Sequence, residues 1–208
     1  MKRATIVAVV VAVSLVLAGS AMAAYIETFD SGKDSWNYGY GTGFAIGTTT
    51  WNATGGNPTA HISGVAQNLY AVWTYTTTPY GDMTGLTMTV DTKVDSATVG
   101  NAQFYVGRNN TYYVDGAWSV GADTTWTTHT AVLDTSNFTR WTQGGAGTES
   151  LAYVLAAPDD IGVFFGGSVA SGAGNVLVDN FGTVPEPATL ALLALGGVGL
   201  LARRRRVK

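Results

Sequence analysis

The chain has 208 residues and no cysteine, which leaves room for one domain of ordinary size and excludes a disulfide framework, a thiolate zinc site and a cysteine nucleophile. The formal net charge is −3, but between Ala24 and Val184 four cations stand against 13 carboxylates, a net charge of −9. An acidic domain repels phosphate backbones, so the composition argues against a nucleic-acid partner.

The first 23 residues contain the three parts of a secretory signal peptide. Met1-Lys2-Arg3 is basic, residues 4–18 are apolar, and Ala21 and Ala23 supply the small side chains that signal peptidase accepts. We therefore expect export and cleavage after Ala23. An uncleaved membrane anchor is the alternative, but a run of about 15 apolar residues is short for a span.

The middle of the chain, residues 24–183, consists of short alternating or apolar stretches separated by Gly, Asn, Asp and Pro. This pattern, together with frequent Thr, Tyr and Trp, predicts an all-β sandwich. One helical turn is expected at 149–155, ended by Pro158. The expected strands are 25–29, 43–51, 59–63, 69–75, 86–90, 102–106, 112–117, 127–133, 161–165 and 175–181.

Four short motifs are spread along this domain. They are Phe29-Asp30-Ser31-Gly32 with Trp36, Trp73 with Pro79-Tyr80-Gly81-Asp82, Trp126, and Val178-Asp179-Asn180-Phe181. Together they resemble the jelly-roll sandwich shared by laminin B (domain IV) modules and many carbohydrate-binding modules. The resemblance implies a galactose-binding-like jelly roll with the three tryptophans in its core, and it supports a fold better than a function.

The same resemblance suggests a structural Ca²⁺ held by Glu27, Asp30 and Asp179, provided that the first and last strands lie side by side. Calcium takes about six to eight oxygen ligands, so backbone carbonyls would have to complete the site. In the alternative interpretation, Asp30 closes a turn with Ser31-Gly32 and Asp179 faces solvent.

No catalytic motif stands out. The stretches 91–96 and 159–160 are typical of turns, and His61 and His129 lie in expected strands with no recognisable motif around them. We therefore expect a non-catalytic domain, with a glycan-active enzyme as a distant alternative.

Aromatic residues outside the resembled core pattern are candidates for stacking on sugar rings. These are Trp51, Tyr112, Tyr113 and Trp118, with Asn109 and Asn110 as polar neighbours. Strand alternation puts Tyr112 and Tyr113 on opposite faces, so only one of them can share a face with a ligand. Each could equally be a half-buried strand aromatic.

Residues 184–208 contain Pro185-Glu186-Pro187, an apolar run at 188–202, and the cluster Arg203, Arg204, Arg205 and Arg206. At about 1.5 Å per residue the apolar run reaches roughly 22 Å, less than the roughly 30 Å of membrane hydrocarbon. A transient signal in the inner membrane, with the arginines at the cytoplasmic face, explains it better than a permanent anchor.

These three parts in this order resemble the PEP-CTERM sorting signal. The resemblance implies that an exosortase, a membrane protease-transpeptidase, acts near Pro185-Glu186-Pro187 in a Gram-negative bacterium that makes exopolysaccharide, often in a biofilm. The domain is then expected at the cell envelope, at the outer surface or in the extracellular matrix. Two function classes remain open, a structural matrix protein and a displayed carbohydrate-binding module with a polysaccharide partner.

Overall fold

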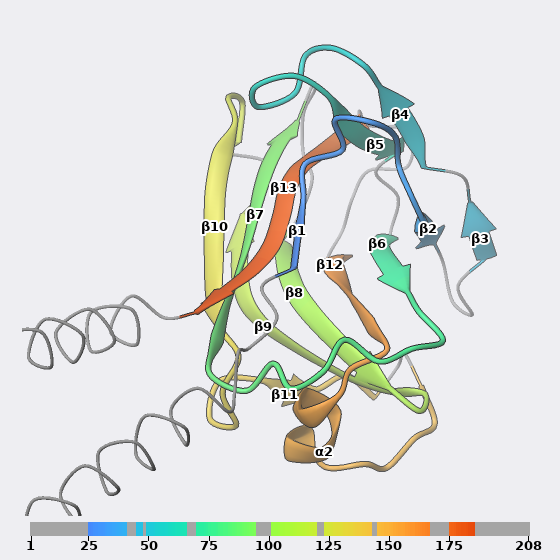
Figure 1. Cartoon of the computed structure of the whole chain (residues 1–208), viewed down its shortest axis with the longest axis vertical. Coiled ribbons are helices and arrows are strands. Elements are labelled where there is room, and N and C mark those ends of the chain that lie inside the picture. Colours follow the sequence, from blue (N-terminus) through green and yellow to red (C-terminus); the bar gives the residue numbers. More distant parts are fainter. Residues whose placement is uncertain are drawn as a thin grey trace, which may run out of the picture.

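The computed structural model describes residues 25–40, 45–47, 49–65, 70–94, 101–119, 123–142, 145–166 and 175–185. Two antiparallel sheets lie face to face in these residues, with one short helix at an end of the sandwich (Figure 1). One sheet has the order β10-β7-β13-β5-β4, with β1 beside the end of β13. Its strands are β1 Tyr25–Glu27, β4 Thr50–Asn52, β5 His61–Val65, β7 Leu86–Val94, β10 Thr127–Val132 and β13 Asn175–Pro185.

The second sheet has seven strands in the order β11-β9-β8-β12-β6-β2-β3. They are β2 Trp36–Tyr40, β3 Ala45–Gly47, β6 Tyr70–Tyr75, β8 Asn101–Arg108, β9 Thr111–Ser119, β11 Thr139–Arg140 and β12 Asp160–Gly166. The predicted all-β sandwich is confirmed. The strands β2 and β11 were not expected, because β2 carries an interior glycine and β11 has only two residues, too few for a visible alternation.

The core lies between the sheets, where alternate residues of each strand point inward. Trp36 is fully buried there, with its ring centroid 4.8 Å from that of Phe181 and 5.4 Å from that of Phe29. Its Nε1 donates to the hydroxyl of Tyr25 at 3.2 Å. The prediction for Trp36 is therefore confirmed.

The other two tryptophans of the resembled pattern differ from Trp36. Trp126 is only half-buried and lies outside the core, where its ring packs edge-on against His61 and its Nε1 donates to the carbonyl of Gly55. The core position expected for it is wrong, because Trp126 precedes β10 instead of alternating within it. Trp73 lies in β6 opposite Gly162, and its side chain falls outside the described structure.

The helix α2, Leu151–Ala156, closes one end of the sandwich beside β8 and β9 (Figure 1). Ser150 caps its first turn, and Leu151, Val154 and Leu155 form the buried face expected from their spacing. The predicted helical turn is confirmed, shifted by about two residues at its start.

The first and last strands do lie side by side, since Tyr25 pairs with Thr183 and Glu27 with Phe181. The expected signal peptide with Ala21 and Ala23 falls outside the described residues, as do Glu186, Pro187, the apolar run 188–202 and the arginine cluster. Within the described residues, no helix has the length and apolar character to cross a membrane.

Candidate functional site

An aromatic cluster lies on the outer face of the seven-stranded sheet. Tyr105 and Phe164 each stand between two core residues, so alternation turns them to the opposite face, and Val114 is directly opposite Tyr105 on the neighbouring strand. All three are buried, beneath the half-buried rings of Tyr112 and Trp141. We call these five residues the outer aromatic patch. A sandwich normally presents polar side chains on this side, and here only the half-buried rings of Tyr112 and Trp141 reach the surface, which makes these two rings the candidate contact for a ligand.

The rings of the patch contact one another edge to face or in a tilted arrangement. The centroids of Tyr112 and Trp141 are 6.2 Å apart, and those of Trp141 and Phe164 are 4.4 Å apart. The backbone N–H of Trp141 donates to the carbonyl of Tyr112 at 2.9 Å, which joins the end of β11 to β9. Sequence reasoning did not select Trp141, because no alternating pattern surrounds it.

Asp160 is the acidic member of this face. It is the first residue of β12, only 7% exposed, and its Oδ1 accepts a hydrogen bond from the hydroxyl of Tyr105 at 3.1 Å. Burial raises the pKa of Asp160 to about 8, with a further contribution from the charge of Asp159. The raised pKa favours the neutral carboxyl, which can donate as well as accept. The turn predicted for this position is wrong, because β12 starts one residue earlier than the apolar run.

The four predicted glycan-binding aromatics occupy three different places. Tyr112 lies in the outer aromatic patch, packed closely against Gly107 and Gly145, where a Cβ would come within 2.5 and 2.9 Å of its ring. Tyr113 points to the core and its hydroxyl donates to the carbonyl of Glu149 at 2.8 Å. The expected separation of these two tyrosines onto opposite faces is therefore confirmed.

The remaining two predicted aromatics, Trp118 and Trp51, lie elsewhere in the sandwich. Trp118 packs against the core and stacks on His129, with ring centroids 4.5 Å apart. Trp51 is 38% exposed on the edge strand β4, and its Nε1 donates to the carbonyl of Phe29 at 2.6 Å. Neither ring is part of the outer aromatic patch.

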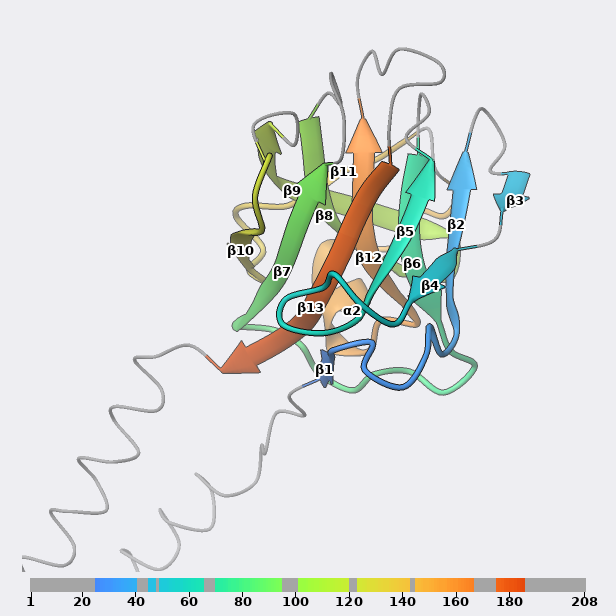
Figure 2. The same cartoon turned by 90° about the horizontal axis from the view of Figure 1, so that it is seen from above.

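A carboxylate pair lies on the outer face of the other sheet. Asp91 and Asp179 are directly opposite each other on β7 and β13, 5% and 1% exposed. Asn57 joins them, because its backbone N–H donates to Asp179 Oδ2 at 2.6 Å and its Nδ2 donates to Asp91 Oδ2 at 3.0 Å. Figure 2 shows the β4–β5 connection that carries Asn57 lying across β13. The turn expected at Asp91 is wrong, since β7 continues to Val94.

The three predicted calcium ligands, Glu27, Asp30 and Asp179, already have hydrogen-bond partners within the domain. Asp30 is exposed and accepts hydrogen bonds from the hydroxyls of Thr28 and Thr59, while Glu27 Oε1 accepts from the backbone N–H of Phe29. The exposed-Asp179 alternative is wrong, because this residue is buried. Among the described residues, no three His, Cys, Asp or Glu side chains gather as a metal-binding group. Calcium binding by Glu27, Asp30 and Asp179 therefore stays a prediction.

Hydrogen bonds from Thr59 and Thr28 lower the pKa of Asp30, whereas the pKa values of the other two carboxyl groups are raised. Burial raises the pKa of Glu27 to about 7, assisted by Asp34 and by the charge of Asp30. Burial likewise raises the pKa of Asp179 to about 6, assisted by the charges of Asp91 and Asp30.

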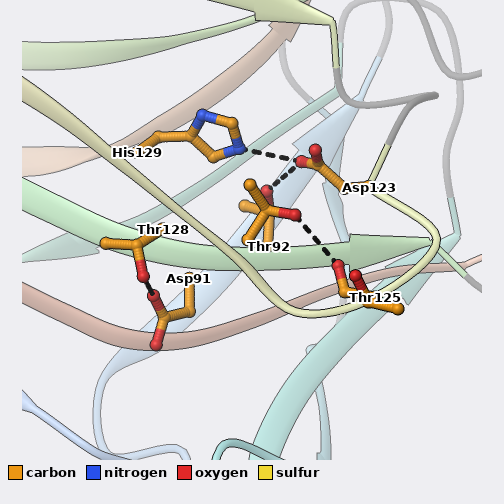
Figure 3. Close-up of polar contacts among 7 residues, drawn as sticks. Asp91, Thr92, Asp123, Thr125, Thr128 and His129 are labelled. Atoms are coloured by element: carbon orange, nitrogen blue, oxygen red, sulfur yellow. Dashed lines mark hydrogen bonds and ion pairs between the residues drawn. The ribbon is translucent and has the colours of Figure 1, made fainter.

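A further polar cluster, which contains His129, lies at the inner face of β10 (Figure 3). Asp123 Oδ2 lies 2.9 Å from His129 Nε2 and accepts from the hydroxyl of Thr92 at 2.6 Å. In a nucleophilic triad the histidine stands between carboxylate and hydroxyl, whereas here the carboxylate stands between the other two. Thr92 is also fully buried. This cluster therefore lacks the arrangement that activates a nucleophile.

Comparison with known proteins shows the fold of the domain and a sorting motif in the tail. The described strands have the fold of a carbohydrate-binding-module β-sandwich, the jelly roll that the motifs implied. Residues 183–206 match the PEP-CTERM protein-sorting motif, which confirms the C-terminal resemblance. No curated protein matches the chain.

Three solved structures illustrate the fold. The family 11 carbohydrate-binding module of Clostridium thermocellum, solved with a β-1,3-1,4-mixed-linked tetrasaccharide, has a TM-score of 0.54 at 15% identity over 80% of this chain and 98% of that one. The CBM22 tandem domain of Paenibacillus barcinonensis Xyn10C has a TM-score of 0.54 at 11% identity, over 80% of this chain and 50% of that one. An exo-β-agarase scores 0.53 at 10% identity over 80% of this chain and 26% of that one.

Proposed function

We propose that this chain is an exported, exosortase-processed surface protein whose sandwich is a non-catalytic carbohydrate-binding module. The PEP-CTERM motif supports sorting to the cell surface or extracellular matrix of a Gram-negative bacterium, after signal peptidase has removed the leader. The carbohydrate-binding-module fold supports the module. The observation on which glycan binding rests is the outer aromatic patch with Asp160 at its side.

The chemistry of the patch suits a sugar. Sugar rings present C–H groups that pack on the faces of Trp and Tyr, and their hydroxyls need donors and acceptors nearby. Trp141 and Tyr112 supply the rings, and Asp160, whose raised pKa favours the neutral carboxyl, supplies a group that can both donate and accept. The net charge of −9 between Ala24 and Val184 opposes anionic polymers, so the proposed ligand is a neutral polysaccharide.

Affinity electrophoresis of the mature domain in gels containing neutral or acidic polysaccharides tests this proposal. We expect retardation by a neutral polymer with Kd on the order of micromolar to millimolar, because few contacts must offset the cost of ordering the chain. Trp141→Ala and Tyr112→Ala should weaken binding about three- to tenfold, the loss of one ring contact.

Trp126→Ala is the matched control, since it removes a half-buried tryptophan that lies outside the patch. Equal weakening by the control and by Trp141→Ala, or retardation unaffected by both patch variants, would contradict a site at the patch. Absence of retardation in every gel would favour the alternative function, a structural matrix protein associated with exopolysaccharide.

A further inference from the structure

The sorting motif and the folded domain overlap. The motif begins at Thr183, but β13 continues to Pro185, the first residue of Pro185-Glu186-Pro187. No spacer therefore separates the sheet from the segment on which processing acts. We propose that the end of β13 must detach from the sheet before the exosortase can process the chain, so that local opening of this strand controls sorting.

The strand end is held on both sides. Thr183 is fully buried and pairs with Tyr25 of β1, whose backbone N–H donates to its hydroxyl at 3.2 Å. On the other side, Thr183, Val184 and Pro185 are paired in turn with Met88, Thr87 and Leu86 of β7. A protease that binds its substrate as an extended chain needs these backbone groups free on the upstream side of the motif.

An irregularity in β13 marks the point at which the proposed opening would stop. The β13–β7 register shifts between Asp179 and Gly182, a bulge where Asn180 has a φ of 47°. Phe181 lies in the core beside the bulge, fully buried against Trp36. Beyond it, Gly182 has no side chain and Val184 and Pro185 are only half-buried. Thr183 is thus the single buried side chain within the segment from Gly182 to Pro185, which favours this segment as a local unfolding unit.

A reversible cross-link tests the proposal in the full-length precursor, produced in a host with an exosortase. The chain has no native cysteine, so an engineered pair is specific. Val184→Cys with Thr87→Cys joins two directly opposite residues at the strand end, a spacing compatible with a disulfide. Leu177→Cys with Lys93→Cys is the matched control, because it joins the same two strands on the far side of the bulge.

Loss of a tag placed after Lys208 measures processing. The electrophoretic mobility of the oxidised chain verifies each cross-link. We expect the Val184–Thr87 cross-link to slow tail removal about tenfold or more, since cleavage that needs opening follows the open population. Reduction should restore the rate, and the Leu177–Lys93 cross-link should leave it unchanged. A flexible spacer of six residues between Val184 and Pro185 should speed processing and rescue the cross-linked variant.

The proposal rests on the exosortase processing proposed above, and the outcomes separate the two. If the wild-type chain keeps its tail, processing itself is refuted and strand opening with it. If the wild-type tail is removed and the oxidised Val184–Thr87 variant is processed equally fast, only the opening step is wrong. A cross-linked variant that the spacer does not rescue would also overturn it, since the block would then come from the cross-link itself.

Discussion

At the scale of single residues, burial controls the charge of this domain. Asp160, Glu27 and Asp179 all have a raised pKa, with burial as the largest cause in each. Asp160 differs from the other two because it lies among aromatic rings on the outer face of the seven-stranded sheet. Asp160 is thus a group with a raised pKa that also belongs to the proposed glycan site.

Asp160 should make the domain less stable as the pH rises. Its folded pKa of about 8 lies above the value of 3.8 for an ordinary aspartate, so folding favours the protonated form. Its contribution to stability is complete below about pH 4 and is lost as the pH rises through about 8, with a slope of at most about 1.4 kcal/mol per pH unit. Urea unfolding between pH 5 and pH 8 measures this, and Asp160→Asn should reduce the slope, leaving the part that Glu27 and Asp179 contribute.

Asp82→Asn, a change at an exposed carboxylate, is the control and should leave the slope intact. A slope unchanged in Asp160→Asn would show that another group titrates in this window.

At the scale of elements, the β4–β5 connection secures the two buried carboxylates of the six-stranded sheet. The side chain of Asn57 donates to Asp91. The side-chain amide of Asn180 donates to the same Asp91 oxygen at 2.7 Å, and the backbone N–H of Asn180 donates to Asp179. These bonds connect a loop and a bulge to the middle of a sheet. They explain how like charges can face each other at a directly opposed pair.

Asn57→Ala should therefore destabilise the domain by about 1–2 kcal/mol, because it removes one donor from the buried Asp91 carboxylate. Chemical denaturation at pH 7 measures the loss. Asn52→Ala, which removes an amide bonded to the Ser63 hydroxyl, is the control, with an expected change below about 0.5 kcal/mol. Equal effects of the two changes would contradict a special role for the connection.

At the scale of the whole molecule, both chain ends of the domain lie at one pole, where β1 and β13 pair (Figure 1). Four carboxyl groups, Glu27, Asp30, Asp91 and Asp179, interact electrostatically with at least one other member of this set. The domain as a whole carries a net charge of −9, which nearby cations would partly offset.

Calcium binding at Glu27, Asp30 and Asp179 stays a prediction, because the carboxylates would have to give up some of their present hydrogen bonds. If calcium binds there, EDTA should lower Tm, since a ligand bound only by the folded state stabilises it by mass action. Asp179→Ala should remove the difference. Identical melting with EDTA and with added calcium would eliminate the site.

The sequence by itself determined the features that depend on local patterns. Period-two alternation indicated an all-β domain, Pro158 marked the end of the short helix, and the Pro-Glu-Pro tail identified the sorting motif. Each of these rests on residues that are neighbours in the chain. The core position of Trp36 and the pairing of the first and last strands came from the family resemblance.

Tertiary structure decided what depends on residues far apart in sequence. Trp141 joins Tyr112 because β11 pairs with β9, and Asp160 receives the hydroxyl of Tyr105 from a neighbouring strand. Asp91 meets Asp179 through the register of β7 and β13, although 88 positions separate them in the sequence. Local propensity carries no information about sheet order or register, because cross-strand pairs form only after distant segments meet. The outer aromatic patch and the overlap of β13 with the sorting motif therefore became visible only in the folded chain.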